Sequence, residues 1–524
     1  MPTIYVSQTA TTSGGITFGV GSDANSYAQA QSPLTPLLTL DTAVNGAIAK
    51  AVTGDTIIVN DGTYTAATFF NISNKNLTIN PATAGAVILK RTGAQTRVLN
   101  IDNSAGTTVL GALVIDAENN SATAGISVAS VAALTTITLN GTIIRNVTGA
   151  TNGGFGSASA LIGVTMNGVN IQTTDCAAVR STTGMTAGSY YVIQGGSYLS
   201  SSCTNVVMET VRISSTATGA YAVVQDSTVL HSNTASPICG CIGIYNTRHL
   251  VQRNRLFASG SSTATSLYRN GSLAAVAAEN SICRWNYGAS TVTGTGGYLF
   301  IIGADATGGA NDNQVNYPCV YGNFLLGSVV ATVQHGIFMG FMNGGVVTGN
   351  VVSRSAIPYI SKVQTERSYW VNNVADKGTA STSGMLRSKG STNATFYGNS
   401  VRSDSVAQNP VVLVDNDGAT NSTGADVFGN VFKVAWTATT INKVAVSSTA
   451  EFGFNDYDID GVSGTPFAYT ASTYATLALW LAAQELTGTS LPVGVKDKNF
   501  WNKLLQGSGP DTLPPSGILP PWGQ

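Results

Sequence analysis

An asparagine recurs along the second half of the chain at the spacing of a repeated turn. Its copies are Asn254, Asn286, Asn323, Asn350, Asn373, Asn399, Asn430 and Asn455, and four of them follow a glycine. Consecutive copies are 32, 37, 27, 23, 26, 31 and 25 residues apart. A period in the twenties, lengthened by insertions, is typical of a solenoid rather than of a globular domain. Because Gly and Asn tolerate left-handed backbone geometry, the spacing predicts asparagines stacked inside one turn, about 4.8 Å apart.

Between the turns, the chain carries short apolar runs and no amphipathic helix. Typical runs are Leu77-Thr78-Ile79, Val109-Leu110 and Val223-Val224. Irregular alternation of this kind is expected for strands with one face in a narrow interior and the other in solvent. Charged residues make up only 10% of the chain, against about a quarter in average globular proteins, which favours strands and turns over exposed helices. The pattern predicts an all-β parallel solenoid over residues 56–460.

The two ends of the chain have a different pattern. Apolar residues between Leu40 and Val52 have helical spacing, which predicts a short N-terminal helix that caps the stack within residues 1–55. In residues 461–524, Ser472 or Thr473 is expected to cap a second helix, and a Pro-rich tail follows. The stripe expected to be apolar on that helix is Leu477, Trp480, Leu481 and Ala482.

Composition excludes several classes of protein. A hydrophobic content of 43% is too high for a disordered chain, and a net charge of −1 argues against broad electrostatic binding to nucleic acid or anionic membrane. No apolar segment reaches the ~18 residues of a membrane span. The first residues lack the features of a secretory signal, so we expect either an unusual export route or incorporation into a virus particle.

Cysteine and histidine usage predicts neither a metal site nor a cofactor. The cysteines are Cys176, Cys203, Cys239, Cys241, Cys283 and Cys319. Their spacing fits neither a redox pair nor a zinc knuckle, so we interpret them as small buried thiols, and the chain contains only three histidines.

Several segments together resemble a known superfamily. They are Ile4-Tyr5-Val6-Ser7, the Gly54-Asp55-Thr56-Ile57-Ile58-Val59 strand entry, Asp61-Gly62-Thr63-Tyr64, the Asn-containing coils, and the closing segment from Asn455 through Trp480. These segments are similar to those of the pectate-lyase-like right-handed, single-stranded parallel β-helix proteins, and most like phage tailspikes and tail fibres. The resemblance implies the fold, whereas this architecture hosts many functions. The Asp-Asp and Gly-His-Gly motifs of the polygalacturonase-like hydrolases are absent from this sequence.

Three carboxylates are candidates for polysaccharide cleavage. Glycoside hydrolysis requires two carboxylates about 5–10 Å apart. Glu209 and Asp226 lie 17 residues apart, close to one coil, and Asp175 lies about a coil earlier. The alternative interpretation is that they cap turns or form solvated salt bridges on the outside of the solenoid.

A second group of residues combines positive charge with aromatic rings. Its members are Arg248, Arg253, Arg255, Tyr268, Arg284 and Trp285. Arginine matches carboxylates and aromatic faces suit sugar rings, so an acidic polysaccharide is a reasonable ligand. The alternative is an interface between subunits, where Arg and Tyr are also enriched.

Three functions are compatible with these observations. The first is a phage tailspike or tail-fibre protein in the virion that binds, and in one version depolymerises, a host surface polysaccharide. The second is a secreted bacterial polysaccharide lyase or hydrolase, and the third is a non-catalytic structural or decoration protein of the virion. The first also predicts contacts with other tail proteins and a homotrimer that buries the apolar residues Phe338, Met339, Phe341 and Met342.

Overall fold

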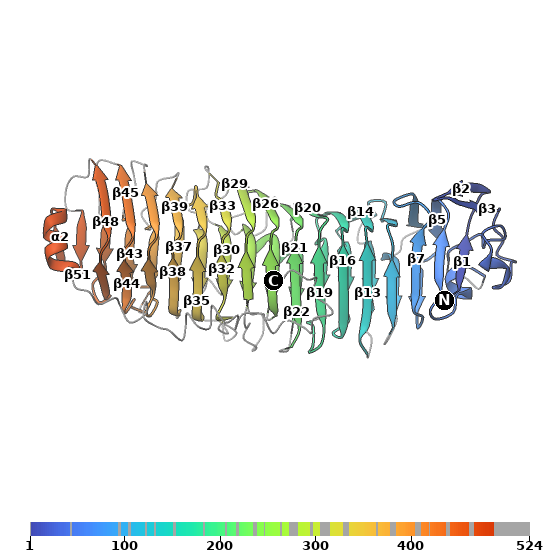
Figure 1. The fold of residues 1–524 in the computed structure, drawn as a ribbon, viewed down its shortest axis with the longest axis horizontal. Helices are drawn as coiled ribbons and strands as arrows, with labels where there is room; N and C mark the ends of the chain where they lie inside the picture. The colour runs from blue at the N-terminus through green and yellow to red at the C-terminus, as the bar shows by residue number, and fades with distance from the viewer. Residues whose placement is uncertain are drawn as a thin grey trace. The chain divides into compact units, whose positions relative to one another are not determined.

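The computed structural model describes most of the chain up to Leu486. The described ranges are 2–41, 45–92, 96–102, 106–120, 123–129, 133–149, 153–181, 184–204, 207–215, 219–233, 238–245, 247–261, 265–271, 281–293, 297–303, 315–328, 335–362, 365–377, 384–403, 410–418, 420–435, 441–460 and 466–486. The chain divides into two compact units, residues 1–234 and residues 235–524. Figure 1 shows that strands stack side by side within each unit.

In the first unit, each coil contributes one strand to each of three parallel sheets, called sheets 1, 2 and 3 in the order that the chain visits them. Sheet 1 contains β1 (Thr3–Val6), β4 (Thr56–Val59), β7 (Leu77–Pro81), β10 (Thr107–Leu110), β13 (Thr135–Asn140), β16 (Ile162–Asn167), β19 (Tyr190–Gln194) and β22 (Tyr221–Gln225). Sheet 2 contains β5 (Gly62–Ala66), β8 (Val87–Arg91), β11 (Val114–Asp116), β14 (Ile143–Thr148), β17 (Asn170–Thr174), β20 (Ser197–Cys203) and β23 (Thr228–Asn233). Sheet 3 contains β6 (Phe70–Ser73), β9 (Arg97–Asp102), β12 (Ala124–Val128), β15 (Phe155–Ser157), β18 (Val179–Ser181) and β21 (Val207–Ser214).

The second unit repeats this arrangement. Sheet 1 contains β25 (Arg248–Gln252), β28 (Ser281–Arg284), β31 (Val315–Asn316), β32 (Cys319–Tyr321), β35 (Met342–Thr348), β38 (Glu366–Val371), β41 (Thr395–Tyr397), β44 (Ala425–Phe428), β47 (Ala450–Gly453) and β51 (Glu485–Leu486). Sheet 2 contains β26 (Arg255–Gly260), β29 (Tyr287–Val292), β33 (Phe324–Leu326), β36 (Val351–Ser353), β39 (Val374–Lys377), β42 (Ser400–Ser403), β45 (Val431–Ala435) and β48 (Asp456–Asp460). Sheet 3 contains β24 (Ile238–Tyr245), β27 (Thr265–Gly271), β30 (Tyr298–Gly303), β34 (His335–Gly340), β37 (Ile357–Lys362), β40 (Leu386–Lys389), β43 (Val412–Asp415), β46 (Asn442–Val444), β49 (Phe467–Tyr469) and the antiparallel β50 (Ser472–Tyr474). The chain is therefore the right-handed parallel β-helix that the sequence predicts.

Register explains how a narrow interior is filled. On sheet 3 of the second unit, Tyr268 is in register with Phe300, and Phe300 with Ile337, so equivalent side chains of successive coils stack. All three are fully buried, and the rings of Tyr268 and Phe300 are 5.4 Å apart. Their strand neighbours Ile301 and Phe338 point to the opposite face of the sheet and are buried as well, so sheet 3 is buried on both faces in these coils.

The ends differ in part from the expectation. The N-terminal unit has a 3-10 turn η1 (Gln29–Gln31), a hairpin of β2 (Thr11–Ser13) and β3 (Ile16–Phe18), and a helix α1 of only four residues (Ala47–Lys50). At the other end, helix α2 (Leu477–Gln484) begins after β50, so Ser472 and Thr473 belong to a strand and do not cap it.

Thr476 takes the capping role, because its hydroxyl accepts a hydrogen bond from the Leu479 amide at 3.3 Å. Trp480 is the buried residue of α2 and its ring packs 4.9 Å from Phe452 and 5.2 Å from Phe467. Leu479 and Leu481 are exposed, so the expected apolar stripe is narrower than its sequence suggested. The Pro-rich tail lies outside the described residues, and the three-part division at residues 55 and 460 stays a prediction.

The cysteines are mostly buried, as the sequence predicts. Four of the cysteines, Cys176, Cys203, Cys241 and Cys283, are buried thiols outside any disulfide, as predicted; Cys319 is a partly exposed thiol, and the side chain of Cys239 lies outside the described part of the chain. Burial raises the pKa of Cys319 to about 12. No helix among the described residues is long and apolar enough to cross a membrane.

The apolar run that we expected at a subunit interface is instead buried within the chain. Phe338, Met339 and Met342 are fully buried and Phe341 is 3% exposed. Phe338 packs with Ile301 and other apolar residues of sheet 3, and Phe341 forms a left-handed turn (φ 55°) between β34 and β35. These side chains are therefore unavailable to a neighbouring subunit.

Candidate functional site

A ladder of asparagines fixes the corner between sheets 1 and 2 of the second unit. Asn323 donates hydrogen bonds from its backbone and side-chain amides to Oδ1 of Asn350, at 3.0 and 2.9 Å. The Nδ2 group of Asn323 also donates to the Cys283 carbonyl at 3.0 Å. The same side-chain bond links Asn254, Asn286, Asn323, Asn350, Asn373, Asn399, Asn430 and Asn455 in order. The predicted ladder is confirmed, and it makes this corner rigid.

The residue that precedes each asparagine has left-handed backbone geometry. Glycine fills this position at Gly322, Gly349, Gly398 and Gly429, with φ between 59° and 64°. Other coils use Arg253 (φ 53°), Trp285 (φ 54°), Asn372 and Phe454 (φ 56°). A bulky residue in this conformation costs about 1–2 kcal/mol, and such strain gathers at functional sites. Arg253 and Trp285, in adjacent coils, were both predicted from the sequence to bind substrate.

An exposed group of rings surrounds Trp285, and we call it the aromatic corner; its members are Arg284, Trp285, Tyr287, Tyr321 and Phe324. Trp285 is 49% exposed, and its ring meets that of Tyr321 edge to face at 5.6 Å and 81°. On sheet 2, the rings of Tyr287 and Phe324 stack at 5.9 Å and 7°, with exposed fractions of 38% and 44%. Apolar area of this extent on an outer face indicates a binding surface.

Arg284 is held in place at the centre of the aromatic corner. Its Nε donates to Oε1 of Gln252 at 2.7 Å, and Nη1 donates to the hydroxyl of Tyr321. The guanidinium carbon lies 4.4 Å from the centre of the Trp285 ring and 5.6 Å from that of Tyr321. Stacking and hydrogen bonds thus fix both the plane and the direction of the guanidinium group.

Two of the remaining predicted binding residues, Arg255 and Arg248, lie on different parts of the surface. Arg255 is exposed at the start of β26, in register with Tyr287, so it belongs to the surface of the aromatic corner. Arg248 lies at the opposite end of β25, four residues from Gln252 and so about 13 Å from the corner.

Tyr268 is not a surface residue. It is fully buried, and its hydroxyl donates to Nε2 of His249, whose Nδ1 lies 2.6 Å from the Thr247 carbonyl. Burial lowers the pKa of His249 to about 4, so the ring is neutral and accepts from the phenol. A ring in this position does not reach a sugar, and Tyr268 leaves the candidate site.

Sequence reasoning missed Tyr321 and Phe324. They stand two residues before and one residue after Asn323, the same offsets that Arg284 and Tyr287 have from Asn286. Alignment of the coils on their asparagines would have found both, because equal offsets place side chains on the same face.

The three predicted catalytic carboxylates lie in the first unit. Glu209 is 1% exposed and 3.3 Å from Arg212, which is in register with Arg180. Burial and the Arg212 charge lower the pKa of Arg180, whereas the Glu209 charge opposes that effect. A buried carboxylate among two arginines is a structural ion pair as it stands.

Asp226 and Asp175 occupy left-handed turns, with φ of 53° and 52°. The Asp175 carboxylate accepts hydrogen bonds from the amide and hydroxyl of Thr204 at 2.7 and 2.9 Å. Asp226 lies just before the start of β23. Glu209 lies near the other end of that strand, because its neighbour Thr210 contacts His231 of β23 at 3.1 Å. Five residues of strand span about 16 Å, so Glu209 and Asp226 do not form the pair that hydrolysis requires.

A different pair of carboxylates is closely placed on sheet 1 of the second unit. Asp426 on β44 is in register with Glu451 on β47, at the strand spacing of about 5 Å. Burial, followed by the charge of Glu451, raises the pKa of Asp426 to about 6, although a 3.3 Å hydrogen bond from Thr395 opposes this. The sequence did not reveal this pair because the two residues are 25 apart with no motif around them.

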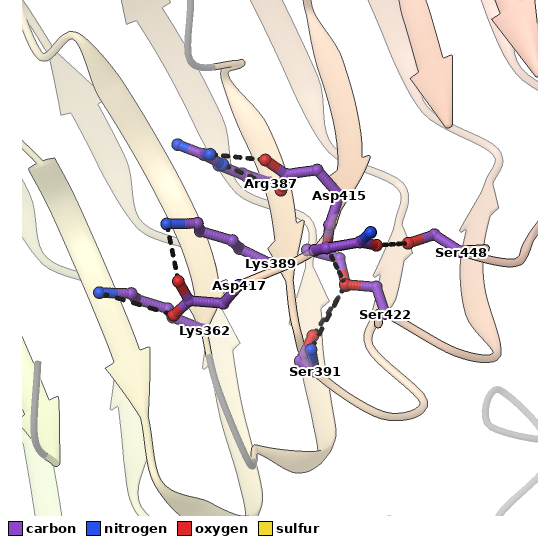
Figure 2. Close-up of polar contacts among 10 residues, drawn as sticks. Lys362, Arg387, Lys389, Ser391, Asp415, Asp417, Ser422 and Ser448 are labelled. Carbon is purple, nitrogen blue, oxygen red and sulfur yellow. Dashed lines mark hydrogen bonds and ion pairs between the residues drawn. The ribbon is translucent and has the colours of Figure 1, made fainter. Parts of the chain in front are cut away.

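Sheet 3 of the second unit carries a group of ion pairs in which three cations meet two carboxylates (Figure 2). Arg387 binds both oxygens of Asp415, at 3.2 and 2.6 Å. Asp417 lies 3.0 Å from the Lys389 ammonium and 3.9 Å from that of Lys362. Both carboxylates are therefore paired with cations of the same sheet, and we interpret the group as structural rather than as a ligand site. Within the described ranges, no group of three or more His, Cys, Asp or Glu residues is arranged to hold a metal ion.

The fold and these sites define a parallel β-helix protein with an exposed aromatic corner. No family model and no curated protein matches the chain. Among solved structures, it is similar to tailspike protein 3 of bacteriophage CBA120, with 14% identity over 77% of this chain and 58% of that chain, at a TM-score of 0.33. It is also similar to the Dettilon tailspike protein (12% identity, 90% and 69% coverage, TM-score 0.35) and to the A-module of the Azotobacter vinelandii mannuronan C-5 epimerase AlgE4 (10%, 86% and 98%, 0.34). Similarity at this level concerns the fold and gives no information about activity or ligand.

Proposed function

We propose that this protein binds a host surface polysaccharide at the aromatic corner, as a tailspike or tail-fibre component of a phage virion. The observation that carries the proposal is Trp285 together with the exposed rings beside it. This residue holds a left-handed conformation where four other coils have glycine, and it leaves 49% of its side chain in solvent. Phe454 has the same backbone and exposure, but only Trp285 lies in the aromatic corner with the exposed, stacked rings of Tyr287 and Phe324, and a group of exposed rings indicates a binding surface.

The surroundings of Trp285 suit a sugar polymer. Sugar rings have apolar faces, and aromatic side chains bind them with a large contact area and little loss of conformational entropy. Tyr287 and Phe324 continue the apolar surface into the next sheet, and the asparagine ladder beneath them limits motion of the corner. A rigid surface loses less entropy when it binds an extended chain.

The test is a matched pair of variants at the same turn position. Trp285→Ala should weaken binding to polysaccharides extracted from a panel of bacterial surfaces by at least about tenfold, as expected for a central aromatic contact. Phe454→Ala is the control, because Phe454 is also 49% exposed and left-handed, at the last turn of the ladder. Equal binding of both variants in affinity electrophoresis would remove the corner from the binding site.

Cleavage of the bound polymer is a second proposal, and the pair Asp426 and Glu451 favours it. Retaining glycosidases hold their carboxyl groups about 5–5.5 Å apart, and a general acid requires a raised pKa. Asp426→Asn should then abolish release of new reducing ends, whereas Glu209→Gln and Asp226→Asn should retain it. Cleavage would also fit a secreted polysaccharide lyase or hydrolase, and its absence would fit a structural virion protein; neighbouring genes for tail proteins would favour a virion protein.

A homotrimer is part of the tailspike proposal. The burial of Phe338 and its neighbours removes the surface on which the sequence-based expectation relied. Light scattering tests the assembly directly: a mass near 53.7 kDa that is unchanged on dilution would rule the trimer out.

A further inference from the structure

We infer that the polymer bound at the aromatic corner is acidic, and that Arg284 binds its oxyanion groups. This inference rests on the proposed function. It follows from the hydrogen bonds that hold the Arg284 guanidinium group in place and from the lack of a carboxylate partner for it among the described residues.

Arg284 is positioned but not neutralised. A guanidinium group has five N–H donors, and the bonds to Gln252 and Tyr321 use two of them. No ion pair joins Arg284 to a carboxylate of any described residue. Three N–H donors therefore remain for a ligand, in the planar fork that matches carboxylate, phosphate or sulfate groups.

The contrast with Arg387 shows what this protein does with an arginine of purely structural use. Arg387 is also partly buried, and Asp415 meets it with two hydrogen bonds. A partly buried cation without such a partner is unfavourable, and an anionic ligand would remove that cost. Arg284 also stacks on Trp285, so an oxyanion bound there would lie beside the exposed ring.

A second positive charge lies across the corner. Arg255 is exposed, has no ion pair with any described residue, and is in register with Tyr287 of the next coil. Arg253, at the preceding turn of the ladder, lies between β25 and β26. An acidic polymer crossing this corner would meet positive charge on both sides of its sugar rings, which favours repeated anionic groups over a single one.

The test compares the acidic and the neutral form of the same polymer. Polygalacturonate, alginate and hyaluronate are each compared with their carboxyl-reduced forms, and dextran with dextran phosphate, by affinity electrophoresis and calorimetry. We expect at least one acidic polymer to bind about tenfold or more tightly than its neutral form, and its affinity to fall between 50 and 500 mM salt. Arg284→Gln should remove most of the preference for the acidic form and lower the salt dependence by the share of one cation, and Arg284→Lys should restore only part of the affinity.

Arg354→Gln is the matched control, because Arg354 is an exposed arginine of the same unit at a left-handed turn outside the aromatic corner. Thermal unfolding establishes that each variant folds. If the neutral forms bind as well as the acidic forms, and Trp285→Ala but not Arg284→Gln weakens them, the corner binds sugars and the inference of an acidic ligand is wrong. If no polymer binds, or if Trp285→Ala changes the mass of the assembly and not its affinity, the proposed function fails as well.

Discussion

The indole ring of Trp285 lies directly over Gly322 of the next coil. A Cβ atom built on Gly322 would come within 2.6 Å of Cδ1 and 3.0 Å of Nε1 of that ring. Gly322 therefore has two functions: its φ of 64° forms the turn before Asn323, and its lack of a side chain leaves room for the tryptophan.

Two glycine substitutions separate these functions. Gly322→Ala should cost about 1–2 kcal/mol in backbone strain and should also displace Trp285. Gly349→Ala has the same strain (φ 62°), but its only neighbour within 4 Å is a backbone nitrogen at that limit. We expect similar losses of stability, together with a loss of polysaccharide binding in Gly322→Ala alone. Equal binding by both variants would show that the position of Trp285 is unimportant.

Removal of one rung should destabilise the asparagine ladder. Asn350 donates to the Val320 carbonyl and to Asn373, and its Oδ1 accepts two hydrogen bonds from Asn323. Asn350→Ala leaves these buried groups unsatisfied, so we expect a loss of about 2–4 kcal/mol. The measurement is the urea midpoint of unfolding. Asn140→Ala is the control, because Asn140 is the exposed end of a separate amide ladder in the first unit and should cost less than about 1 kcal/mol.

The buried histidine predicts weaker stability in acid. The folded pKa of His249 is about 4, below the ordinary value of 6.5, so between these values the unfolded chain binds more protons than the folded chain. Its stabilising contribution is present above pH 6.5 and is lost as the pH falls towards 4, by about 2–3 kcal/mol at pH 4.5. In His249→Gln, the urea midpoint should lack this part of the pH dependence. Parallel pH profiles for wild type and variant would contradict the assignment of a neutral buried ring.

The Asp426 carboxyl group should make the protein less stable as the pH rises, which is opposite to the effect of His249. Its folded pKa is about 6, above the ordinary value of 3.8, so the folded chain binds more protons between these values. Stability from this group is present below pH 3.8 and is lost as the pH rises through 6. Asp426→Asn should therefore stabilise the protein at pH 8, by about 1–2 kcal/mol after allowance for solvent screening, and not at pH 4. Asp458→Asn, at an exposed pair with Lys433, should give no such pH-dependent gain.

The parts of the fold that repeat were predictable, and the parts that depend on neighbours were not. The asparagine spacing was sufficient to locate a ladder in eight coils, because each rung requires the same residue at the same turn. The cap of α2 was misplaced because Ser472 pairs with β49, a tertiary contact that outweighs its local preference. Glu209 and Asp226 were expected to lie close because their separation of 17 residues was equated with one coil, whereas register partners in sheet 1 of this unit are 27–31 residues apart, so the two residues lie at different positions around the coil.

The asparagine ladder has a single direction, since each member donates to the one that follows it in the chain. A structure built in this way can change length by whole coils. Deletion of residues 350–372 would place Asn373 where Asn350 stood, so that Asn323 again has an acceptor and each sheet loses one strand without a change of register. Unequal recombination between the gene segments that encode such coils would lengthen or shorten the protein and keep its fold. The distance from the aromatic corner to the C-terminal helix would then change in steps of about 4.8 Å.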